Sequence, residues 1–386
     1  MQVTTVQPDN LEQTAKLAGE AMAAGGLVVF PTETVYGLAA SVDSAEGLSA
    51  LREFKDRSDG QPFTVHLPGR DAVELYVDAS DSTLQRLIRK SLPGPVTLVA
   101  EVTDDVIANR VRKWLDGGLF DGLSVDEVRD LLYHENTIGL RCPDHIIGQA
   151  ILAATSGPVV ATSANRRGDA PPRDVDEAVT SVGDAAAMVI DGGPCRFAKP
   201  STIVRVRTGE TMENAITVER EGVYDERIIK KMLKWTALMV CSGNTCRSPM
   251  AEGLARHMIA RQRGINEADL NSHGLNVLSA GTFAMDGMPV SPEAVDVLQR
   301  QGIDISGHRS TALTTELIHQ ADVIYCMTRS HLSVILNSVP AVADRVFLID
   351  PEGDIEDPIG GGVDVYDRCQ AQIGRGLEQR LKEHLQ

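Results

Sequence analysis

The sequence predicts an α/β protein with two domains: an N-terminal mixed, twisted α/β sheet domain with a cleft, and a C-terminal doubly wound parallel sheet. Short apolar runs typical of buried strands alternate with amphipathic helical patterns along most of the chain. This alternation restarts at Ala237, directly after a helical segment over residues 225–234. The length of 386 residues also provides enough material for two separate cores. We therefore expect one domain over residues 1–234 and a second over residues 235–386.

The N-terminal elements begin with a helix over residues 11–24, for which Asn10 is a good N-cap and Gly25-Gly26 a stop. The apolar run that follows predicts a short buried strand over residues 27–30. Two late strands follow one another without a helix between them, so we expect a mixed sheet rather than a purely parallel one. The other strands are expected over residues 63–67, 96–100, 137–141, 159–162, 188–191, 202–206 and 216–220, and the other helices over 45–54, 82–90, 124–133 and 146–154.

The C-terminal elements alternate more regularly, which is typical of a doubly wound parallel sheet. The strands are expected over residues 237–241, 275–280, 323–327 and 345–348, and the helices over 249–263, 292–301, 331–339 and from 363 onward. Ligands of such sheets bind at the carboxyl ends of the strands. The loop after the first strand is therefore the most promising site in this domain.

The composition excludes several classes of protein. Apolar residues make up 42% and charged residues 24%, which is ordinary for a globular protein. The net charge of −17 disfavours binding of polyanions except at a local basic groove. Residues 1–19 lack a signal-peptide pattern, no stretch is apolar enough to cross a bilayer, and six Cys are too sparse for a secreted disulfide scaffold. We expect a cytoplasmic protein with free thiols and no membrane partner.

A candidate phosphate-binding loop lies between the first strand and the first helix of the C-terminal domain, over residues 241–248 (CSGNTCRS) and before Pro249. Backbone N–H groups of such a loop and of the following helix converge on one point, where they favour an anion and the thiolate form of Cys241. Arg247 offers a planar guanidinium to two phosphate oxygens, and Ser248 can cap the helix. A structural cysteine beside a surface ion pair is the alternative, but this spacing at this position favours a nucleophile.

This loop resembles that of the low-molecular-weight protein phosphatases, and the likeness extends over nearly the whole C-terminal domain. Further matching stretches are residues 279–282 (SAGT), 302–304 (GID) with His308, and 321–328 (ADVIYCMT). The resemblance implies that Cys241 becomes a phosphocysteine while Asp357 protonates the leaving group and then activates water. Asp357 is favoured over Asp350 because residues 359–361 (IGG) and Tyr366 continue the family pattern after it.

Two details of this resemblance concern the substrate. Tyrosine-directed members usually carry an aromatic residue after the Asp-Pro pair, against which a phenyl ring stacks, whereas Ile359 and two glycines follow here. Thr245 stands where tyrosine-directed relatives tend to carry Ile, and a hydroxyl there resembles the protein-arginine-phosphatase branch. We therefore favour protein phosphoarginine as the substrate, with phosphotyrosine as the alternative.

The other loop residues have supporting roles in this interpretation. Ser242 and Gly243 belong to the phosphate loop, and Asn244 braces it. Ser248 is expected to donate a hydrogen bond to the thiolate. Cys246 has two interpretations: a partner for a reversible disulfide with Cys241 that protects the nucleophile, or a small buried filler.

In the N-terminal domain, polar and cationic residues follow several of the expected strands. Together they would form a cleft suited to an anion such as a nucleoside triphosphate. Each residue taken alone also has a structural explanation, as a turn former, a core histidine or a solvated helix end. These residues are the stretch 30–38 (FPTETVYGL), Lys55 and Arg57, His66, Arg141, 163–165 (SAN) and Ser201-Thr202.

The pattern as a whole resembles the threonylcarbamoyl-AMP synthase family over roughly residues 11–234. Other matching stretches are residues 93–97 (PGPVT), 141–145 (RCPDH) and 190–193 (IDGG). The resemblance implies condensation of L-threonine, bicarbonate and ATP to threonylcarbamoyl-AMP and pyrophosphate. This product is the activated intermediate for modifying adenosine in certain tRNAs, so the tRNA modification machinery would be an indirect partner.

The same resemblance implies a role for each matching residue. Threonine would contact Thr34, His66, Arg141, Ser163 and Ser201, with Arg141 suited to the amino-acid carboxylate. ATP would contact Lys55, Arg57, Gln61 and Asn165, with Mg²⁺ at the same phosphates and no protein metal ligand assigned. Three features depart from the family: Ser58 replaces a frequent Pro, Gln61 replaces a usual Asn, and residues 101–136 are longer than expected.

The sequence therefore predicts a bifunctional enzyme, a threonylcarbamoyl-AMP synthase followed by a phosphoprotein phosphatase. The alternative for the N-terminal domain is a nucleotide or RNA sensor that regulates the phosphatase. Arg166-Arg167 is a basic spot that would suit RNA, although it is also typical of a solvated surface.

Overall fold

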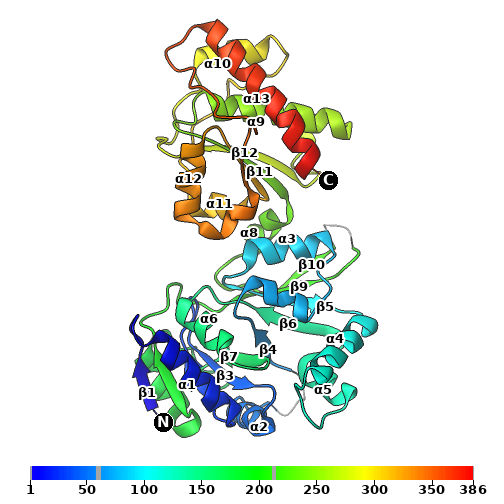
Figure 1. Ribbon diagram of the computed structural model, residues 1–386, viewed down its shortest axis with the longest axis vertical. Coiled ribbons are helices and arrows are strands. Elements are labelled where there is room, and N and C mark those ends of the chain that lie inside the picture. The colour runs from blue at the N-terminus through cyan, green and yellow to red at the C-terminus, as the bar shows by residue number, and fades with distance from the viewer. Residues whose placement is uncertain (1, 58–61, 211–213, 386) are drawn as a thin grey trace. The chain divides into compact units, whose positions relative to one another are not determined.

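Two separate sheets organise the computed structural model, which describes residues 2–57, 62–210 and 214–385 (Figure 1). The chain divides into two units, residues 1–230 and 231–386, with one sheet in each. None of the helices in the described part is both long and apolar enough to span a membrane.

The first unit contains a sheet of ten strands over its described residues. The strands are β1 (Gln2–Thr5), β2 (Val28–Phe30), β3 (Gly37–Ser41), β4 (Thr64–His66), β5 (Val96–Glu101), β6 (Thr137–Arg141), β7 (Val159–Ser163), β8 (Met188–Asp191), β9 (Thr202–Val206) and β10 (Ile216–Arg220). The α-helices are α1 (Leu11–Ala23), α2 (Ala45–Phe54), α3 (Ser82–Ser91), α4 (Asp104–Asp116), α5 (Val125–Leu132), α6 (Ile146–Ala153), α7 (Val175–Val182) and α8 (Glu226–Leu233), which crosses the division between the units.

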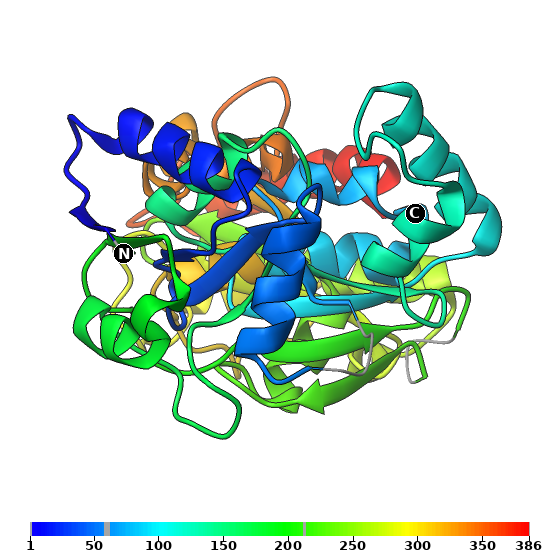
Figure 2. The ribbon, with the colours of Figure 1, turned by 90° about the horizontal axis from the view of Figure 1, so that it is seen from below.

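The sheet of the first unit is mixed, as the sequence predicts. Its strand order is β1-β8-β2-β3-β7-β4-β6-β5-β9-β10. Strand β4 is parallel to β6, and β5 is parallel to β9, while β5 and β6 are antiparallel. Helices α1 and α6 pack together on one face of the sheet over the apolar side chains of β2, β3, β7 and β8, and Figure 2 shows α1 in dark blue on one side of the blue strands.

Local signals explain several of these elements. Ser44 caps α2 by accepting a hydrogen bond from the N–H of Gly47 at 3.1 Å, and Ser124 and Glu127 form a capping box at the start of α5. The first helix begins at the expected residue, and Asn10 occupies the expected N-cap position, but its side chain makes no capping hydrogen bond. The amide of Asn10 donates to Thr5 O and accepts from the Gln7 N–H instead, which ties the helix to the preceding segment.

Four elements of the first unit are absent from the sequence prediction: β1, β3, α4 and α7. Strand β3 has the sequence GLAAS, which is poor in β-branched and aromatic residues. It is nevertheless central, paired with β2 on one side and β7 on the other. Its strand conformation therefore depends on tertiary pairing rather than on local preference.

The second unit contains a parallel sheet of four strands in the order β12-β11-β13-β14. The strands are β11 (Trp235–Cys241), β12 (Leu275–Gly281), β13 (Val323–Cys326) and β14 (Val346–Leu348). The α-helices are α9 (Arg247–Arg263), α10 (Pro292–Gln299), α11 (Thr315–Gln320), α12 (Arg329–Ser338) and α13 (Val363–His384). Of these helices, the sequence missed only α11.

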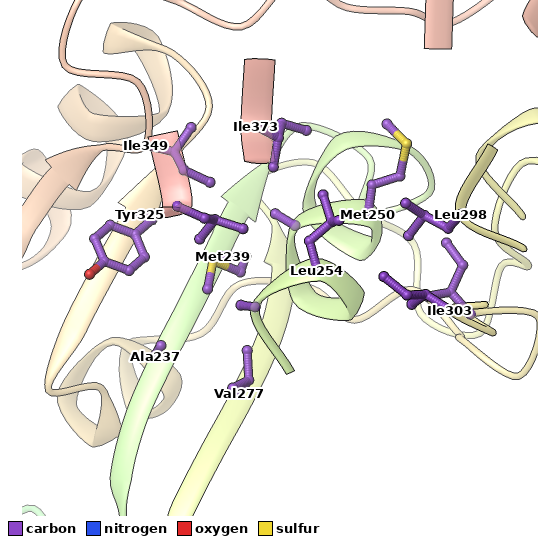
Figure 3. Packing of buried hydrophobic residues seen from close by; sticks show 14 of the residues in the cluster. Ala237, Met239, Met250, Leu254, Val277, Leu298, Ile303, Tyr325, Ile349 and Ile373 are labelled. Carbon is purple, nitrogen blue, oxygen red and sulfur yellow. The ribbon is translucent and has the colours of Figure 1, made fainter. Parts of the chain in front are cut away.

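The central strand β11 buries both of its faces, which explains the layers of this unit. Met239 packs with α9, α10 and α13 on one face, where Figure 3 shows it near Tyr325 and Leu254. Leu238 and Val240 point to the other face, where they pack with α11 and α12. Helices therefore cover both sides of a parallel sheet, which is the doubly wound arrangement that the sequence predicts.

Candidate active sites

The loop over residues 241–248 connects β11 to α9 at the carboxyl end of the parallel sheet. Cys241 is the last residue of β11 and Arg247 the first of α9, so both side chains start from rigid elements. The loop is held beside the end of β12 by backbone hydrogen bonds from Thr282 N–H to Cys241 O at 2.9 Å and from Phe283 N–H to Ser242 O at 3.0 Å. Its position is thus fixed by the sheet.

Hydrogen-bond donors surround the sulfur of Cys241. The backbone N–H of Asn244 donates to Sγ at 3.2 Å, and the Ser248 hydroxyl lies 3.0 Å from Sγ. Donors aimed at a buried sulfur stabilise the thiolate, which is the nucleophilic form. The prediction that Ser248 caps α9 is wrong, because Cys246 occupies the N-cap position and the Ser248 hydroxyl faces Cys241.

Asn244 braces the loop from inside. Its backbone is in the left-handed region, with φ of 54°, and the residue is completely buried. Its amide nitrogen donates to Ser248 Oγ and Ser279 Oγ, both at 2.8 Å, and its amide oxygen accepts from Thr311 N–H at 2.7 Å. Two segments distant in sequence, at Ser279 and Thr311, therefore hold one loop residue together with Ser248, which favours a preorganised site.

A partly buried acid and a histidine extend this network behind the loop. The Ser279 hydroxyl donates to Glu252 Oε2 at 2.7 Å, and burial raises the pKa of Glu252. His308 Nε2 lies 3.0 Å from Asn244 O, and its Nδ1 lies 3.8 Å from Glu252 Oε2. The sequence analysis assigned no role to Glu252. It lies about one and a half turns along α9, and nothing in the neighbouring sequence indicates its contacts with Ser279 and His308.

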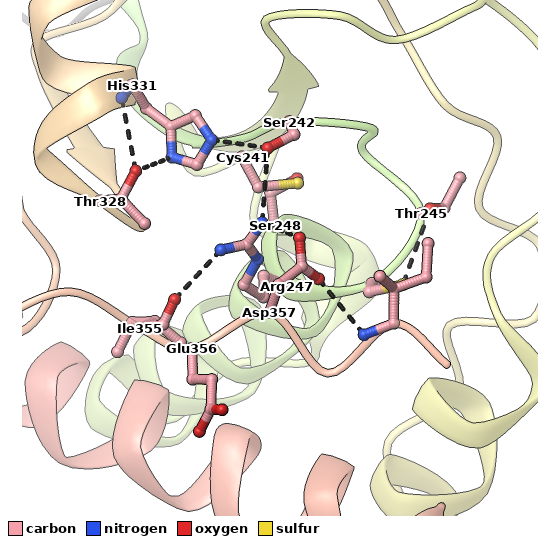
Figure 4. Close-up of polar contacts among 12 residues, drawn as sticks. Cys241, Ser242, Thr245, Arg247, Ser248, Thr328, His331, Ile355, Glu356 and Asp357 are labelled. Atoms are coloured by element: carbon pink, nitrogen blue, oxygen red, sulfur yellow. Dashed lines mark hydrogen bonds and ion pairs between the residues drawn. The ribbon is translucent and has the colours of Figure 1, made fainter. Parts of the chain in front are cut away.

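The guanidinium of Arg247 and the carboxylate of Asp357 form an ion pair at the loop (Figure 4). Arg247 Nη1 also donates to Ile355 O at 3.0 Å, and Nη2 donates to Ser242 Oγ at 3.4 Å. Asp350, the other candidate acid, is engaged elsewhere, with Gln372 Nε2 at 2.7 Å. The structure therefore places the Cys241 thiol, the Arg247 guanidinium and the Asp357 carboxylate at the same loop.

Thr245 and Cys246 lie on the α10 side of the loop. Cys246 is buried, and its sulfur lies 3.2 Å from Ser291 Oγ, 3.4 Å from the Tyr366 hydroxyl and 3.7 Å from Thr245 Oγ1. Cys241 and Cys246 are both free thiols here. The three hydroxyl groups give Cys246 a polar setting that a simple apolar filler would not require.

Two large apolar side chains close to the loop are open to solvent. Phe283, whose backbone is hydrogen-bonded to the loop, is 81% exposed, and Ile359, two residues after Asp357, is 69% exposed. Sequence reasoning did not single out Phe283. An exposed aromatic residue whose backbone is bonded to this loop suits a substrate side chain, either a phenyl ring or a guanidinium.

In the first unit, a cavity of about 470 Å³ lies over one face of the ten-stranded sheet. Strand register explains why its polar residues converge, since directly paired residues project to the same face. His66 of β4 pairs with Arg141 of β6. Leu98 of β5 pairs with Leu140 of β6, so the preceding Thr97 lies beside Arg141. On its other side, Thr97 pairs with Ile203 of β9. The polar and charged lining residues are Thr32, Tyr36, Arg57, Thr64, His66, Thr97, Arg141, Thr162, Ser163, Asn165, Ser201 and Arg220.

Arg141 is the most buried cation of this cavity. Its Nη2 donates to Glu33 Oε1 at 3.2 Å and to the hydroxyl group of Thr34, while Glu33 Oε2 accepts from Asp144 N–H at 3.1 Å. Arg141 Nε is also buried and has no hydrogen-bond partner in the described part of the chain. Because Arg141 lines the cavity, its guanidinium is suited to a carboxylate or phosphate bound there. Thr34 itself acts behind Arg141 and does not line the cavity.

His66 is neutral in this site. Burial, together with the neighbouring Arg141, lowers the pKa of His66 to about 3. Its Nδ1 lies 3.1 Å from Thr64 O, to which it donates. The neutral ring therefore has Nε2 as an acceptor for a ligand group.

Lys55 connects the end of α2 to the end of β7. Its Nζ donates to Ser163 O at 3.0 Å and to Asn165 O at 2.6 Å, and it does not line the cavity directly. Burial and the nearby Arg57 lower the pKa of Lys55 to about 8. Asn165 and Arg57 do line the cavity, whereas Gln61 lies outside the described residues.

Arg220 is a cavity residue that sequence reasoning missed. Its Nη2 donates to Ser201 O at 2.9 Å and to Ser201 Oγ at 3.2 Å, and Ser201 Oγ lies 2.9 Å from Thr97 Oγ1. Burial and the nearby Arg141 lower the pKa of Arg220. Its position at the end of the expected strand 216–220 gave no sign of this role, because the contact with Ser201 depends on the pairing of β10 with β9.

No cluster of three His, Cys, Asp or Glu residues capable of holding a metal ion occurs in residues 2–57, 62–210 or 214–385. The lining residues of the cavity include no carboxylate. A divalent cation entering with a nucleotide would therefore be held by phosphate oxygens rather than by side chains of this cavity.

Comparisons with known proteins agree with this division into two sites. Residues 20–222 match the Sua5_yciO_yrdC family model, described as "Telomere recombination", and residues 236–386 match the model "Low molecular weight phosphotyrosine protein phosphatase". The first part is similar to the threonylcarbamoyl-AMP synthase of Chromohalobacter salexigens, with 29% identity over 52% of this chain and 99% of that protein.

The second part is similar to two phosphatases with different names. One is the protein-arginine-phosphatase of Bacillus subtilis, with 36% identity over 38% of this chain and 94% of that protein. The other is a probable low molecular weight protein-tyrosine-phosphatase, EpsP, of Ralstonia nicotianae, with 36% identity over 37% of this chain and 91% of that protein.

Proposed function

Because the chain belongs to the Sua5/YrdC family in its first unit and to the low-molecular-weight phosphatase family in its second, both of them enzyme families, we propose that it catalyses two separate reactions. The first unit condenses L-threonine, bicarbonate and ATP to threonylcarbamoyl-AMP and pyrophosphate. The second unit hydrolyses phosphoarginine in proteins. The first product would serve tRNA modification, and both reactions suit a reducing cytoplasm in which Cys241 stays a free thiol.

The observation that carries the phosphatase proposal is the arrangement of Cys241, Arg247 and Asp357 around one point. The substrate phosphoryl group binds to Arg247 and the loop N–H groups, and this requires it to displace the Asp357 carboxylate from the guanidinium. Asp357 takes up a proton from water when it leaves Arg247. Cys241 Sγ attacks phosphorus, the bond from phosphorus to the leaving nitrogen breaks, and Asp357 gives its proton to that nitrogen. Water next attacks the phosphorus of the phosphocysteine and gives a proton to Asp357, the bond from sulfur to phosphorus breaks, and phosphate leaves as the Cys241 thiolate is restored.

Phosphoarginine is the proposed substrate for two reasons. The hydroxyl of Thr245 provides a polar group in the loop, and Ile359 and its following glycines provide no aromatic wall after the Asp-Pro pair. The exposed ring of Phe283 suits a guanidinium and a phenyl ring alike, so it favours neither substrate. The two named relatives give no preference, since both are 36% identical to this chain.

The substrate is tested by turnover on two peptides of the same sequence, one with phosphoarginine and one with phosphotyrosine at the same position. We expect a higher kcat/KM for the phosphoarginine peptide. Faster hydrolysis of the phosphotyrosine peptide would overturn the substrate assignment while leaving the phosphatase assignment intact.

The observation that carries the synthase proposal is that Arg141 and Arg57 both line one cavity. Arg141, which lines the cavity, would bind the threonine carboxylate through its guanidinium, with His66 Nε2 accepting from the substrate hydroxyl or amine. Arg57 and Asn165 would bind the triphosphate, which enters with Mg²⁺, and the charge of Lys55 would act on it from behind Asn165. Ser163 and Ser201 would complete the threonine side. Catalysis here would consist of positioning and charge neutralisation.

Pyrophosphate release by the full-length protein tests this proposal. We expect release to require threonine and bicarbonate together with ATP. A nucleotide or RNA sensor would bind ATP without releasing pyrophosphate, so that outcome would support the regulatory alternative.

A further inference from the structure

His331 is a buried histidine that the proposed reaction does not yet use. It lies in the first turn of α12, where the Thr328 hydroxyl caps the helix, and it is only 4% exposed. Its ring points toward the catalytic loop, and Nε2 lies 2.9 Å from Ser242 Oγ (Figure 4). Ser242, the residue directly after Cys241, thus contacts a helix that lies more than eighty residues later in the chain.

A continuous series of hydrogen bonds leads from this ring to Arg247. Arg247 Nη2 donates to Ser242 Oγ at 3.4 Å, the same oxygen that contacts His331 Nε2. On the other side of the ring, Nδ1 lies 2.8 Å from Thr328 Oγ1, and this oxygen lies 2.8 Å from Ser330 Oγ. Figure 4 shows Thr328, His331, Ser242 and Arg247 in this order.

The protonation state of the ring sets the direction of these bonds. Burial and the nearby Arg247 lower the pKa of His331 to about 4, so the ring is neutral at pH 7. With the proton on Nδ1, the ring donates to Thr328 and accepts the Ser242 proton at Nε2. Both lone pairs of the Ser242 hydroxyl then remain available to the guanidinium, and each donor in the series has an acceptor.

We propose that His331 is a positioning residue of the phosphatase site, which holds the Ser242 hydroxyl in the orientation that fixes Arg247 for phosphate binding. This inference rests on the proposed phosphatase function. His331 does not contact the reacting atoms and acts only through Ser242.

The need for such a residue follows from the movement of Asp357. Asp357 must leave Arg247 when a substrate phosphoryl group binds, and the guanidinium then keeps two protein contacts, Ile355 O at 3.0 Å and Ser242 Oγ at 3.4 Å. A serine hydroxyl can rotate between three rotamers, only some of which face Arg247. Anchoring that hydroxyl to a buried ring maintains the second contact throughout turnover.

Two substitutions separate this role from a structural one. His331→Asn places an amide near the position of Nδ1, so it can still bond to Thr328 but cannot reach Ser242. His331→Gln extends its amide to the position of Nε2 and can accept from Ser242. If His331 served only to hold the helix through its Thr328 contact, the Gln variant would lose at least as much activity as the Asn variant, because Gln places no amide at the position of Nδ1.

We expect His331→Asn to lower kcat/KM for p-nitrophenyl phosphate about tenfold and to weaken competitive inhibition by inorganic phosphate by a similar factor. The Gln variant should recover to within about threefold of the parent protein. Ser242→Ala should resemble the Asn variant, and combining Ser242→Ala with His331→Asn should cause no further loss, because both remove the same contact.

Three outcomes would overturn the inference: parent-like phosphate inhibition in the Asn variant, equal losses in the Asn and Gln variants, or losses that multiply in the double variant. If both His331 variants had a lowered melting temperature and equal losses of kcat/KM, His331 would have a structural role, and this result would also contradict the inference. Cys241→Ser, measured in parallel, separates failure of the His331 inference from failure of the proposed phosphatase function. If this variant still hydrolyses the substrate, the proposed function itself is wrong.

Discussion

The two sites hold their principal arginines by different kinds of ion pair. In the second unit, Arg247 pairs with Asp357, whose side chain is 44% exposed, whereas in the first unit Arg141 pairs with Glu33, whose side chain is 1% exposed. A half-exposed carboxylate can exchange its partner for water at little cost, but a buried one cannot. The difference in exposure supports our proposal that Asp357 leaves its arginine during catalysis, whereas Glu33 stays in place as a counter-ion.

The sites also differ in how the chain builds them. The phosphatase nucleophile and its arginine come from a single loop over residues 241–248, whereas the cavity of the first unit combines residues from Thr32 to Arg220. A single loop is positioned by one strand and one helix. The cavity requires several strands in register, so its function depends on the whole sheet.

The largest expected effect separates the two sites completely. Cys241→Ser should lower phosphatase turnover by about 10⁴-fold or more, because it removes the nucleophile. The same protein should release pyrophosphate at the parent rate when given threonine, bicarbonate and ATP. Phosphate release and pyrophosphate release from one purified preparation provide the measurement, and parallel losses of both would contradict two independent sites.

The second prediction compares the two acidic partners directly. Asp357→Asn should lower phosphatase kcat by about 10²- to 10³-fold, because it removes the general acid, and should leave the melting temperature unchanged. Glu33→Gln should instead destabilise the first unit by about 3–5 kcal/mol, because it leaves a buried guanidinium without its counter-ion. Calorimetry on both full-length variants tests this contrast, and a stable Glu33→Gln protein would show that Glu33 is not a fixed counter-ion.

Much of the fold could be predicted from the sequence because its signals are local. The bounds of α2, β6, β8, β9 and β10 agree with the prediction at both ends. Serine caps and glycine stops mark the helices, and apolar runs mark the buried strands. Strand β3 was not predicted because its small residues carry no strand preference. Helix α4 was not predicted because it belongs to the unusually long segment over residues 101–136.

The third prediction concerns the pH dependence of the first unit. With a pKa of about 8, the Lys55 ammonium loses its proton as the pH rises through 8, so any contribution of its charge to ATP binding is present below pH 8 and lost above it. We expect kcat/KM for ATP to decrease above that pH, by up to about tenfold per pH unit. Lys55→Arg keeps its charge and should remove this decrease. An identical profile in both proteins would exclude Lys55 as the titrating group.

The contents of the two sites were predictable to different degrees. Cys241 and Arg247 could be identified from spacing alone, because one loop after one strand brings them together. Arg220 and His331 could not, since each reaches its site only through pairing or packing of distant segments. The buried role of Glu33 was equally hidden, because an acid next to Thr34 gives no sign in sequence that it faces an arginine more than one hundred residues away.

The smallest expected effect tests substrate choice within the phosphatase loop. Thr245→Ile replaces the hydroxyl by an apolar group and should lower the ratio of phosphoarginine to phosphotyrosine turnover by about five- to tenfold, because a polar group suited to a guanidinium is lost while the phosphate cradle is kept. Thr245→Ser is the matched control, since it keeps the hydroxyl and removes only a methyl group, and its ratio should stay close to that of the parent protein. The measurement is kcat/KM on the paired peptides. If both variants change the ratio equally, the methyl group rather than the hydroxyl determines selectivity, and the assignment of phosphoarginine loses its support from this residue.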